Sequence, residues 1–350
     1  MDALISPRRR TLLLGALGTA ALAACQRPES QAETQRLHLT GETMGSTFNV
    51  KLDSAGQPAE RLQAAVHSAL QSVDARMSLY RPESELNGFN RAGAGAPVPM
   101  SAEFFAVLAA AQDISRWSNG AFDVTVAPAV ETWGFGVNKQ RRVPAAEQVA
   151  LQRGRVDWRA LDLDPVERTA SKGLQGLQVD LGGIAKGYGV DAVAKSLDAL
   201  GIAHYMIEVG GEVRTRGVNG ASQPWQIGIE EPDATPQQAR HIVPLSGRAM
   251  ATSGDYRIYF EEGGRRYSHE IDPTTVAPIA HRLCSVTVVA DDCMRADGLA
   301  TALIVLGPER GFELAERSGV AAQFIERTAP GRYSDRMTSA FAALGARPAA

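Results

Sequence analysis

The sequence is poor in cysteine, carries little net charge and has no hydrophobic run long enough to cross a membrane. Three cysteines occur in 350 residues, and the formal net charge is −3. A mildly acidic protein has no surplus of positive charge for nucleic acid, so we expect no nucleic-acid partner. Cys284 and Cys293 lie in the body of the chain. They could form a disulfide or remain two buried thiols, because their spacing alone does not decide.

The two common glycine-rich nucleotide motifs are also missing. In the stretch "VDLGGIAKGYGVD" (179–191), Lys186 precedes Gly187 and no Ser or Thr follows, so the stretch is not a phosphate-binding P-loop. The third glycine of a GxGxxG motif is replaced by Ala192. Glycine in a helix costs about 1 kcal/mol relative to alanine, so these glycines still suggest close approach of a backbone or a ligand. A strand-to-helix turn that binds nothing is the alternative.

The first 24 residues have the pattern of a secretory signal peptide. Arg8 to Arg10 precede a short apolar run (11–24) that ends in small residues. The sequence "LAAC" (22–25) resembles a bacterial lipobox, in which Cys25 would be lipidated and become the new N-terminus. We therefore expect an exported protein, lipid-anchored in the bacterial cell envelope and facing the periplasm, with residues 25–36 as a polar tether. The stretch "RRRTLL" is compatible with either Sec or twin-arginine export.

The remaining chain, 37–345, predicts a mixed α/β (α+β) fold, as one large domain or two intimately joined ones. Apolar residues at helical spacing over 59–77 indicate an amphipathic helix. A second helix is expected to begin near Ser101 and to stop at Asn119 and Gly120. Strands are expected at "LHLTGE", "FNVKL", "HYMIEVG", "WQIGIEE", "SVTVVA" and "AAQFIE".

Asp297 and Thr301 are four residues apart and would therefore share one face of a helix. A carboxylate and a hydroxyl one turn apart suit Mg²⁺, which prefers oxygen ligands and completes its shell with water and phosphate oxygens. The alternative is structural: Asp297 caps the helix, and Thr301 bonds back to its own chain.

Two further polar residues stand out from their surroundings. His269 lies close to Asp272 in a polar, glycine-rich region, where a neighbouring group could orient it or shift its pKa. The alternative for His269 is a surface residue near a turn that Asp272 and Pro273 begin. Asp123 lies within the strand-like apolar run "GAFDVTVAP" (120–128), and a buried acid there would need a partner.

Seven segments in order along the chain resemble the ApbE family, the FAD:protein FMN transferases. Each segment is modest alone, but together they cover nearly all of the chain after the signal peptide. They are "TMGSTFNV" (43–50), "MSLYRPESELNGFN" (77–90), "GAFDVTVAPAVETWGFG" (120–136), "VDLGGIAKGYGVDAVA" (179–194), "ATSGDY" (251–256), "YSHEIDPTT" (267–275) and "ADGLATAL" (296–303).

The resemblance implies roles for individual residues. It places contacts with FAD at Met44, Tyr80, Ala121, Phe122, Asp123, Asp180, Lys186 and, through the backbone, Ile271. It assigns Mg²⁺ to the side chains of Asp297 and Thr301 and to the backbone carbonyl of Gly183. It identifies His269 as the residue proposed to act in the transfer step.

One position departs from the family pattern. The family usually reads "HxxDPxTG", whereas Val276 stands here in place of the glycine, and Pro278 is kept. The turn after Thr275 is therefore expected to be built differently.

The resemblance also implies the fold and the activity. The fold would be of the ApbE type, two intimately joined α/β subdomains with the flavin site between them. The activity would be Mg²⁺-dependent transfer of the FMN moiety of FAD, the substrate, to a threonine or serine hydroxyl of a target redox protein, with release of AMP. His269, with an ordinary pKa near 6.5, would accept the proton of that hydroxyl. The alternatives are an FAD pyrophosphatase that gives FMN and AMP, and a non-catalytic FAD-binding lipoprotein.

Overall fold

The computed structural model describes residues 35–349. Its largest part is an eight-stranded antiparallel sheet with the strand order β1-β2-β6-β7-β10-β15-β16-β17. These strands are β1 (Arg36–Thr43), β2 (Ser46–Asp53), β6 (Tyr205–Val209), β7 (Glu212–Arg216), β10 (Ala249–Gly254), β15 (Leu283–Ala290), β16 (Ala321–Ala329) and β17 (Arg332–Met337).

The other strands form small sheets. They are β3 (Val98–Pro99), β4 (Leu161–Asp164), β5 (Thr169–Lys172), β8 (Trp225–Glu230), β9 (Ala239–Leu245), β11 (Tyr259–Glu262), β12 (Arg265–Ser268), β13 (Ile271–Asp272), β14 (Ala277–Pro278) and β18 (Arg347–Pro348). The α-helices are α1 (Ala59–Met77), α2 (Glu85–Arg91), α3 (Ala102–Trp117), α4 (Ala127–Thr132), α5 (Ala146–Arg153), α6 (Ala185–Ala199), α7 (Cys293–Leu306), α8 (Arg310–Arg317) and α9 (Ser339–Ala342).

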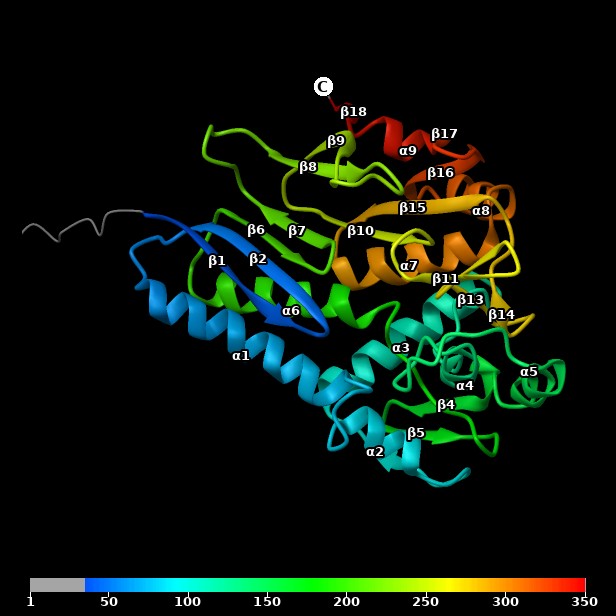
Figure 1. The fold of residues 1–350 in the computed structure, drawn as a ribbon. Coiled ribbons are helices and arrows are strands. Elements are labelled where there is room, and N and C mark those ends of the chain that lie inside the picture. Colours follow the sequence, from blue (N-terminus) through cyan, green and yellow to red (C-terminus); the bar gives the residue numbers. More distant parts are fainter. Residues whose placement is uncertain (1–34, 350) are drawn as a thin grey trace, which may run out of the picture.

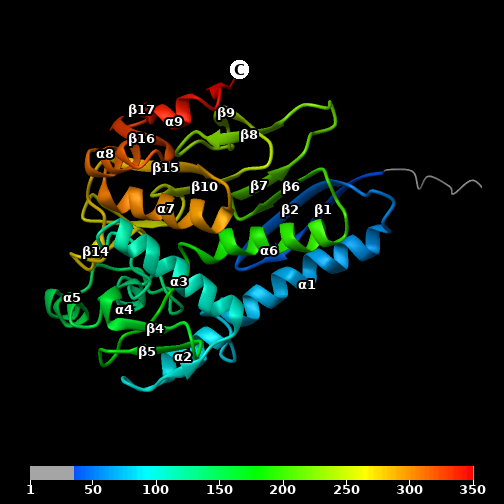
Figure 2. The same ribbon diagram turned by 180° about the vertical axis from the view of Figure 1, so that it is seen from behind.

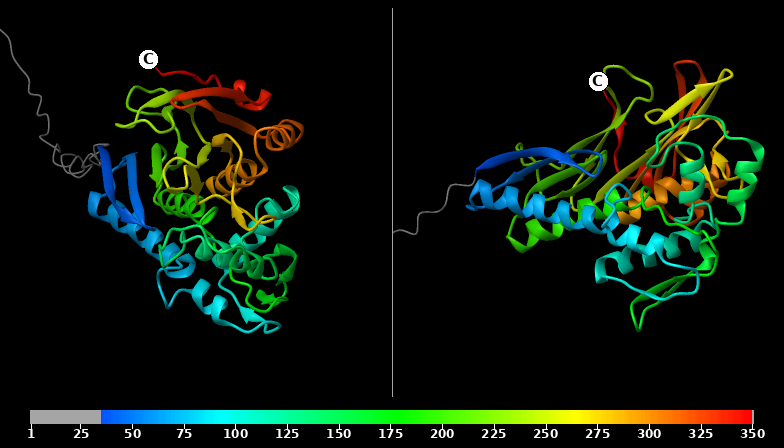
Figure 3. Two further views of the ribbon diagram at one scale, coloured as in Figure 1. Left: turned by 45° about the vertical axis from the view of Figure 1, so that its right-hand side comes forward. Right: turned by 60° about the horizontal axis from the view of Figure 1, so that its bottom comes forward.

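Helices cover one face of the large sheet and a small sheet covers the other (Figures 1 and 3). On the helical face, Leu62 of α1 and Val193 of α6 pack with Ile207 of β6. On the opposite face, the three-stranded sheet β18-β9-β8 contributes Trp225, which packs in a cluster with Val289. All eight residues of β15 are buried, because this central strand is covered on both faces; this explains its continuous apolar sequence.

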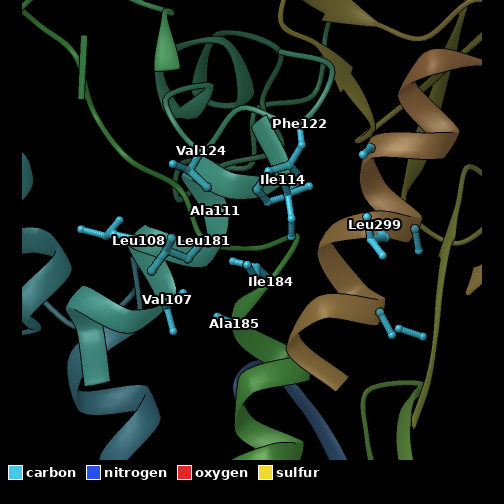
Figure 4. Close-up of a cluster of buried hydrophobic side chains, with 14 of the residues drawn as sticks. Val107, Leu108, Ala111, Ile114, Phe122, Val124, Leu181, Ile184, Ala185 and Leu299 are labelled. Atoms are coloured by element: carbon cyan, nitrogen blue, oxygen red, sulfur yellow. The ribbon is translucent and has the colours of Figure 1, made fainter. Parts of the chain in front are cut away.

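A smaller region, built from α2, α4, α5 and the sheet β3-β5-β4, lies beyond α3 (Figure 2). α3 packs against α7, and one continuous apolar core contains residues of both regions. Figure 4 shows part of this core, where Ile114 of α3, Phe122, Ile184 and Leu299 of α7 converge. The protein is therefore mixed α/β, as predicted, and its two regions share a core.

Most elements expected from the sequence are present. The helix expected over 59–77 is α1, whose buried residues repeat at helical spacing. The side chain of Ser101 caps α3 by accepting a hydrogen bond from the backbone N–H of Phe104. Asn119 and Gly120, which follow α3, both have positive φ, as expected of residues that stop a helix. The six strand-like runs form β1, β2, β6, β8, β15 and β16.

The strand-like run at 120–128 does not form a strand. These residues form turns that lead into α4, apart from a single bridge between Val126 and Gln178. Asp123 accepts hydrogen bonds from the backbone N–H and the hydroxyl of Thr125, each at 2.7 Å. This local side-chain bonding bends the backbone in place of a strand ladder. Pro128 then stands at the start of α4, where proline is well tolerated.

Cys284 and Cys293 are two free, buried thiols, which decides between the alternatives left open by their spacing. Cys25, the signal peptide at 1–24 and most of the tether lie outside the described residues. Among residues 35–349, none of the helices is both long and apolar enough to cross a membrane.

Candidate flavin and metal site

One cavity of about 1730 Å³ is lined by all twelve residues to which the family resemblance gives a role in the body of the protein. It is larger than a typical small-molecule site of about 300–1,000 Å³. The cavity lies where the β1–β2 turn, the loops before α2, α4 and α6, the strands β10 and β13, and α7 meet. The twelve residues are Met44, Tyr80, Ala121, Phe122, Asp123, Asp180, Gly183, Lys186, His269, Ile271, Asp297 and Thr301. Their contacts with FAD or a metal ion stay predictions.

The glycines that open α6 allow the chain to approach α7 closely. A Cβ atom at Gly183 would lie 2.9 Å from the hydroxyl oxygen of Thr301. A Cβ atom at Gly187 would lie 2.8 Å from Cβ of Asp297, and it would also overlap the backbone carbonyl of Cys293. These contacts are shorter than van der Waals packing allows, so both positions require glycine if the spacing of α6 and α7 is to be kept.

The three residues expected to bind Mg²⁺, Gly183, Asp297 and Thr301, lie together where α6 meets α7. The hydroxyl of Thr301 donates to the backbone carbonyl of Gly183 at 3.5 Å, and it lies 3.1 Å from Oγ of Ser253. Asp297 is only 3% exposed, and its Oδ2 accepts from the N–H of Gly187 at 2.9 Å. Residues 35–349 hold no group of three or more His, Cys, Asp or Glu side chains that could bind a metal. An ion here would therefore have the carboxylate of Asp297 and would rely otherwise on hydroxyl, carbonyl and substrate oxygens.

The helix-cap alternative for Asp297 is wrong. The N-cap of α7 is Asp292, whose side chain accepts from the backbone N–H of Arg295. Thr301 bonds across to another segment, and not back along its own helix. Burial raises the pKa of the Asp297 carboxyl above its ordinary value, and the charge of Lys186 opposes this shift. A buried carboxylate of this kind is stabilised by a cation, so the residues present fit a hard metal ion.

Lys186 forms an ion pair with Glu212, with 2.5 Å between Nζ and Oε1. Burial alone would lower the pKa of Lys186, but the carboxylates of Glu212 and Asp297 hold it above its ordinary value. Glu212 is almost fully buried, and its second oxygen, Oε2, has no hydrogen-bond partner. The pair therefore fixes the ammonium group of Lys186 in the cavity wall.

Asp123 and Asp180 shape the loops of the cavity wall. Oδ1 of Asp123 bonds to Thr125, and its Oδ2 accepts from the backbone N–H of Trp158 at 3.0 Å, which supplies the partners expected for a buried acid. Burial nevertheless raises the pKa of Asp123 to about 6. Oδ1 of Asp180 accepts from the backbone N–H of Gly182 at 2.7 Å. Both carboxylates thus fix turns at which backbone groups line the cavity.

The two aromatic residues expected near FAD have different environments. Phe122 is part of the hydrophobic core as well as of the cavity wall. Tyr80 is 58% exposed, and the ammonium of Lys139 lies 5.4 Å from the centre of its ring. Tyr80 therefore leaves a ring face available for a planar ligand. Met44 lies in the β1–β2 turn with φ of +50°, close to Gly189 of α6.

His269 follows β12 directly and is half-buried. Its Nδ1 is buried with no hydrogen-bond partner, whereas Nε2 lies 3.7 Å from Oε1 of Glu270. Burial and the charge of Lys186 lower the pKa of the imidazole below its usual 6.5. The ring is therefore neutral near pH 7, which leaves a lone pair able to accept a proton.

The carboxyl group nearest to His269 is not the one expected from the sequence. Asp272 was expected to flank the imidazole, but its Oδ1 accepts from the backbone N–H of Thr274. Asp255 is held by two hydrogen bonds of 3.0 Å from Arg327. Glu270 is the carboxylate that lies beside Nε2.

Val276 adopts φ of +57°, in the left-handed region that favours glycine and is rare for a β-branched residue. Its backbone N–H donates to the carbonyl of Asp272 at 2.8 Å, and its own carbonyl accepts from the indole N–H of Trp133 at 2.9 Å. The expectation of a differently built turn is not supported, because the valine takes up a glycine-like backbone conformation. The two hydrogen bonds and the burial of its side chain hold it there.

The polar residues of the cavity wall that were not identified from the sequence include Glu212, Ser253 and Glu270. Glu212 follows two glycines in "VGGEV", and Glu270 follows His269 directly. The spacing of these residues in the sequence does not indicate a function. They stand out only through their contacts in the folded chain: Glu212 with Lys186, Ser253 with Thr301, and Glu270 with His269.

Comparison with known proteins agrees with the fold. The ApbE family model matches residues 44–324. An FAD:protein FMN transferase from Haemophilus influenzae is 44% identical over 331 residues, which cover 92% of this chain and 94% of that protein. A protein of the same name from Vibrio cholerae is 41% identical over 323 residues, covering 91% and 94%.

Solved structures give the same result. The crystal structure of the flavinyl transferase ApbE of Pseudomonas stutzeri, in its apo form, matches with a TM-score of 0.81 and 42% identity. The match covers 89% of this chain and 97% of that one. The flavin transferase ApbE of Vibrio cholerae also has a TM-score of 0.81, at 39% identity, with coverage of 89% and 99%. On this evidence of sequence and structure, the chain belongs to the ApbE family.

Proposed function

We propose that this protein transfers the FMN moiety of FAD to a threonine or serine hydroxyl of a target redox protein and releases AMP. The observation that carries the proposal is the similarity, over more than nine tenths of the chain, to proteins named FAD:protein FMN transferase. The gathering of the twelve predicted residues around one cavity supports it.

FAD would bind across the cavity as a substrate. The exposed ring face of Tyr80 offers packing surface for a planar ring. Lys186, held in place by Glu212, supplies the positive charge next to the pyrophosphate. Backbone groups fixed by Asp123 and Asp180 complete the wall.

Mg²⁺ fits the oxygen atoms of Asp297, Thr301 and the carbonyl of Gly183. When bound, it would neutralise charge on the pyrophosphate and orient it for in-line displacement. The Thr301 hydroxyl bonds to the Gly183 carbonyl and contacts Ser253. These contacts hold the hydroxyl and the carbonyl close together, and Gly187 holds Asp297 beside them.

His269 would accept the proton of the attacking hydroxyl. Since Nδ1 is buried, Nε2 is the nitrogen available toward the cavity. The neutral ring takes the proton as the oxygen attacks phosphorus, and AMP leaves with the electrons of the broken P–O bond.

The proposal extends to location. The sequence pattern at 1–25 supports export, cleavage before Cys25 and anchoring by lipid in the cell envelope, facing the periplasm. Acceptor proteins would then be exported or membrane redox proteins.

Product analysis tests the activity. The purified soluble body is incubated with FAD and Mg²⁺, with and without a candidate acceptor protein, and nucleotides are separated by chromatography. We expect AMP to appear in step with loss of FAD only when the acceptor is present, without free FMN. Equal amounts of free FMN and AMP without an acceptor would instead show an FAD pyrophosphatase. Binding of FAD with no product would show a carrier.

A further inference from the structure

We propose that Glu270 is a positioning residue for the transfer step, whose carboxylate stabilises the imidazolium that forms when Nε2 of His269 takes the proton of the acceptor hydroxyl. This inference rests on the proposed function and assigns a role to a residue at an unspecified position of the family motif "HxxDPxTG".

The geometry singles out Glu270 among the carboxylates near His269. Its Oε1 lies 3.7 Å from Nε2, too far for a hydrogen bond but close enough for an ion pair once Nε2 carries a proton. Glu270 is buried and lines the cavity, and a backbone hydrogen bond from Gly254 helps to hold its carboxyl group. Asp255, in contrast, is already neutralised by Arg327.

The contact between Glu270 and His269 can favour the transfer step because the positive charge on His269 appears only during that step. While His269 is neutral, an ionised Glu270 gains little from it. As the hydroxyl proton moves to Nε2, a positive charge appears beside the carboxylate, and the attraction grows with it. An interaction that strengthens only toward the transition state raises kcat and not substrate affinity. In the balanced step, the acceptor O–H bond breaks, Nε2–H and O–P bonds form, and AMP leaves with the electron pair of its P–O bond.

The surrounding charges determine when Glu270 is ionised. Burial raises the pKa of its carboxyl to about 8, Lys186 on α6 lowers it, and Asp255 after β10 and Asp297 on α7 raise it. The imidazole of His269 is affected by Lys186 and by Arg141 from the loop after α4, both of which lower its pKa. Only the ionised carboxylate assists, so the rate of transfer should increase as the pH rises through the pKa of Glu270.

The test compares Glu270→Gln with wild type in single-turnover transfer from FAD to an acceptor protein, across pH 6 to 10. Gln keeps the shape but has no charge. We expect its rate at high pH to fall on the order of tenfold, with a nearly unchanged Kd for FAD and with no rise near pH 8. Glu270→Asp should keep the rise with a smaller rate, because it keeps the charge.

Glu261→Gln serves as the matched control, because it removes an exposed carboxylate from the neighbouring hairpin, β11–β12. It should behave as wild type. A Glu270→Gln protein with the wild-type rate and pH profile would overturn the role of Glu270 while leaving the proposed function intact. Absence of transfer by the wild-type protein with several acceptors would contradict the proposed function itself.

Discussion

The backbone N–H of Gly187 donates a hydrogen bond to Oδ2 of Asp297 at 2.9 Å, and so joins the first turn of α6 to α7 across 110 residues of sequence. The same glycine has no space for a side chain, because α7 lies against it. The position of the Asp297 carboxylate therefore depends on the spacing between α6 and α7.

Asp297→Ala should abolish Mg²⁺-dependent transfer with little loss of structure. The side chain is proposed to serve the ion, and its removal leaves only the Gly187 N–H without an acceptor. We expect calorimetric Mg²⁺ titration in the presence of FAD to show no binding, while circular dichroism stays as in wild type. Full activity of the variant in the presence of a chelator would contradict the metal role.

Gly187→Ala should destabilise the protein by about 1–3 kcal/mol, because the added methyl group forces α6 and α7 apart in a packed core. Gly88→Ala, in α2, is the control: a Cβ there meets nothing within 4 Å. It should be neutral or stabilising by up to about 1 kcal/mol, since alanine favours helix. Urea unfolding of both variants measures the difference. Equal stabilities would show that the close approach of the helices does not require glycine.

His269→Ala should bind FAD with near-normal affinity but transfer FMN roughly 100- to 10,000-fold more slowly, the usual effect of losing a general base. A histidine acts as a base only when neutral, so wild-type activity is lost as the pH falls through its pKa. Burial and Lys186 lower that pKa, so we expect this acid limb below pH 6.5 and expect it to vanish in the variant. Asp255→Asn and Asp272→Asn should keep the wild-type acid limb, and its loss in either one would move the base elsewhere.

Cys25→Ser should release the protein from the membrane fraction, because the lipid anchor is proposed to be attached at that sulfur. Cell fractionation followed by immunoblotting measures the distribution. Membrane association that matches the wild type would reject lipidation at Cys25.

Local patterns in the sequence predicted much of the fold. The helical spacing of Leu62, Val66, Leu70, Val73 and Met77 predicted α1, since burial of one face is enough to fix an amphipathic helix. The run at 120–128 does not form a strand, and the reason is physical. Its apolar alternation resembles a strand, but the Asp123 side chain bonds to Thr125 two residues away and turns the chain.

The predicted site residues line one cavity, although their roles stay predictions. Thr301 bonds to Gly183, and Asp297 bonds to Gly187 in the same segment. Glu212 and Glu270 could not be assigned in this way, because the ion pair of Lys186 and Glu212 spans two separate elements, and the position of Glu270 beside Nε2 depends on the turn after β12. The same is true of Val276, whose glycine-like φ is visible only in the folded chain.

The measurement that tests the account most directly is the intact mass of an acceptor redox protein after incubation with this enzyme, FAD and Mg²⁺, followed by peptide mapping. We predict an increase equal to one FMN joined through phosphate, located on a single threonine or serine, and absent when Asp297→Ala replaces the wild-type protein. An acceptor of unchanged mass, while FAD is bound or hydrolysed, would contradict FMN transfer as the function of this protein.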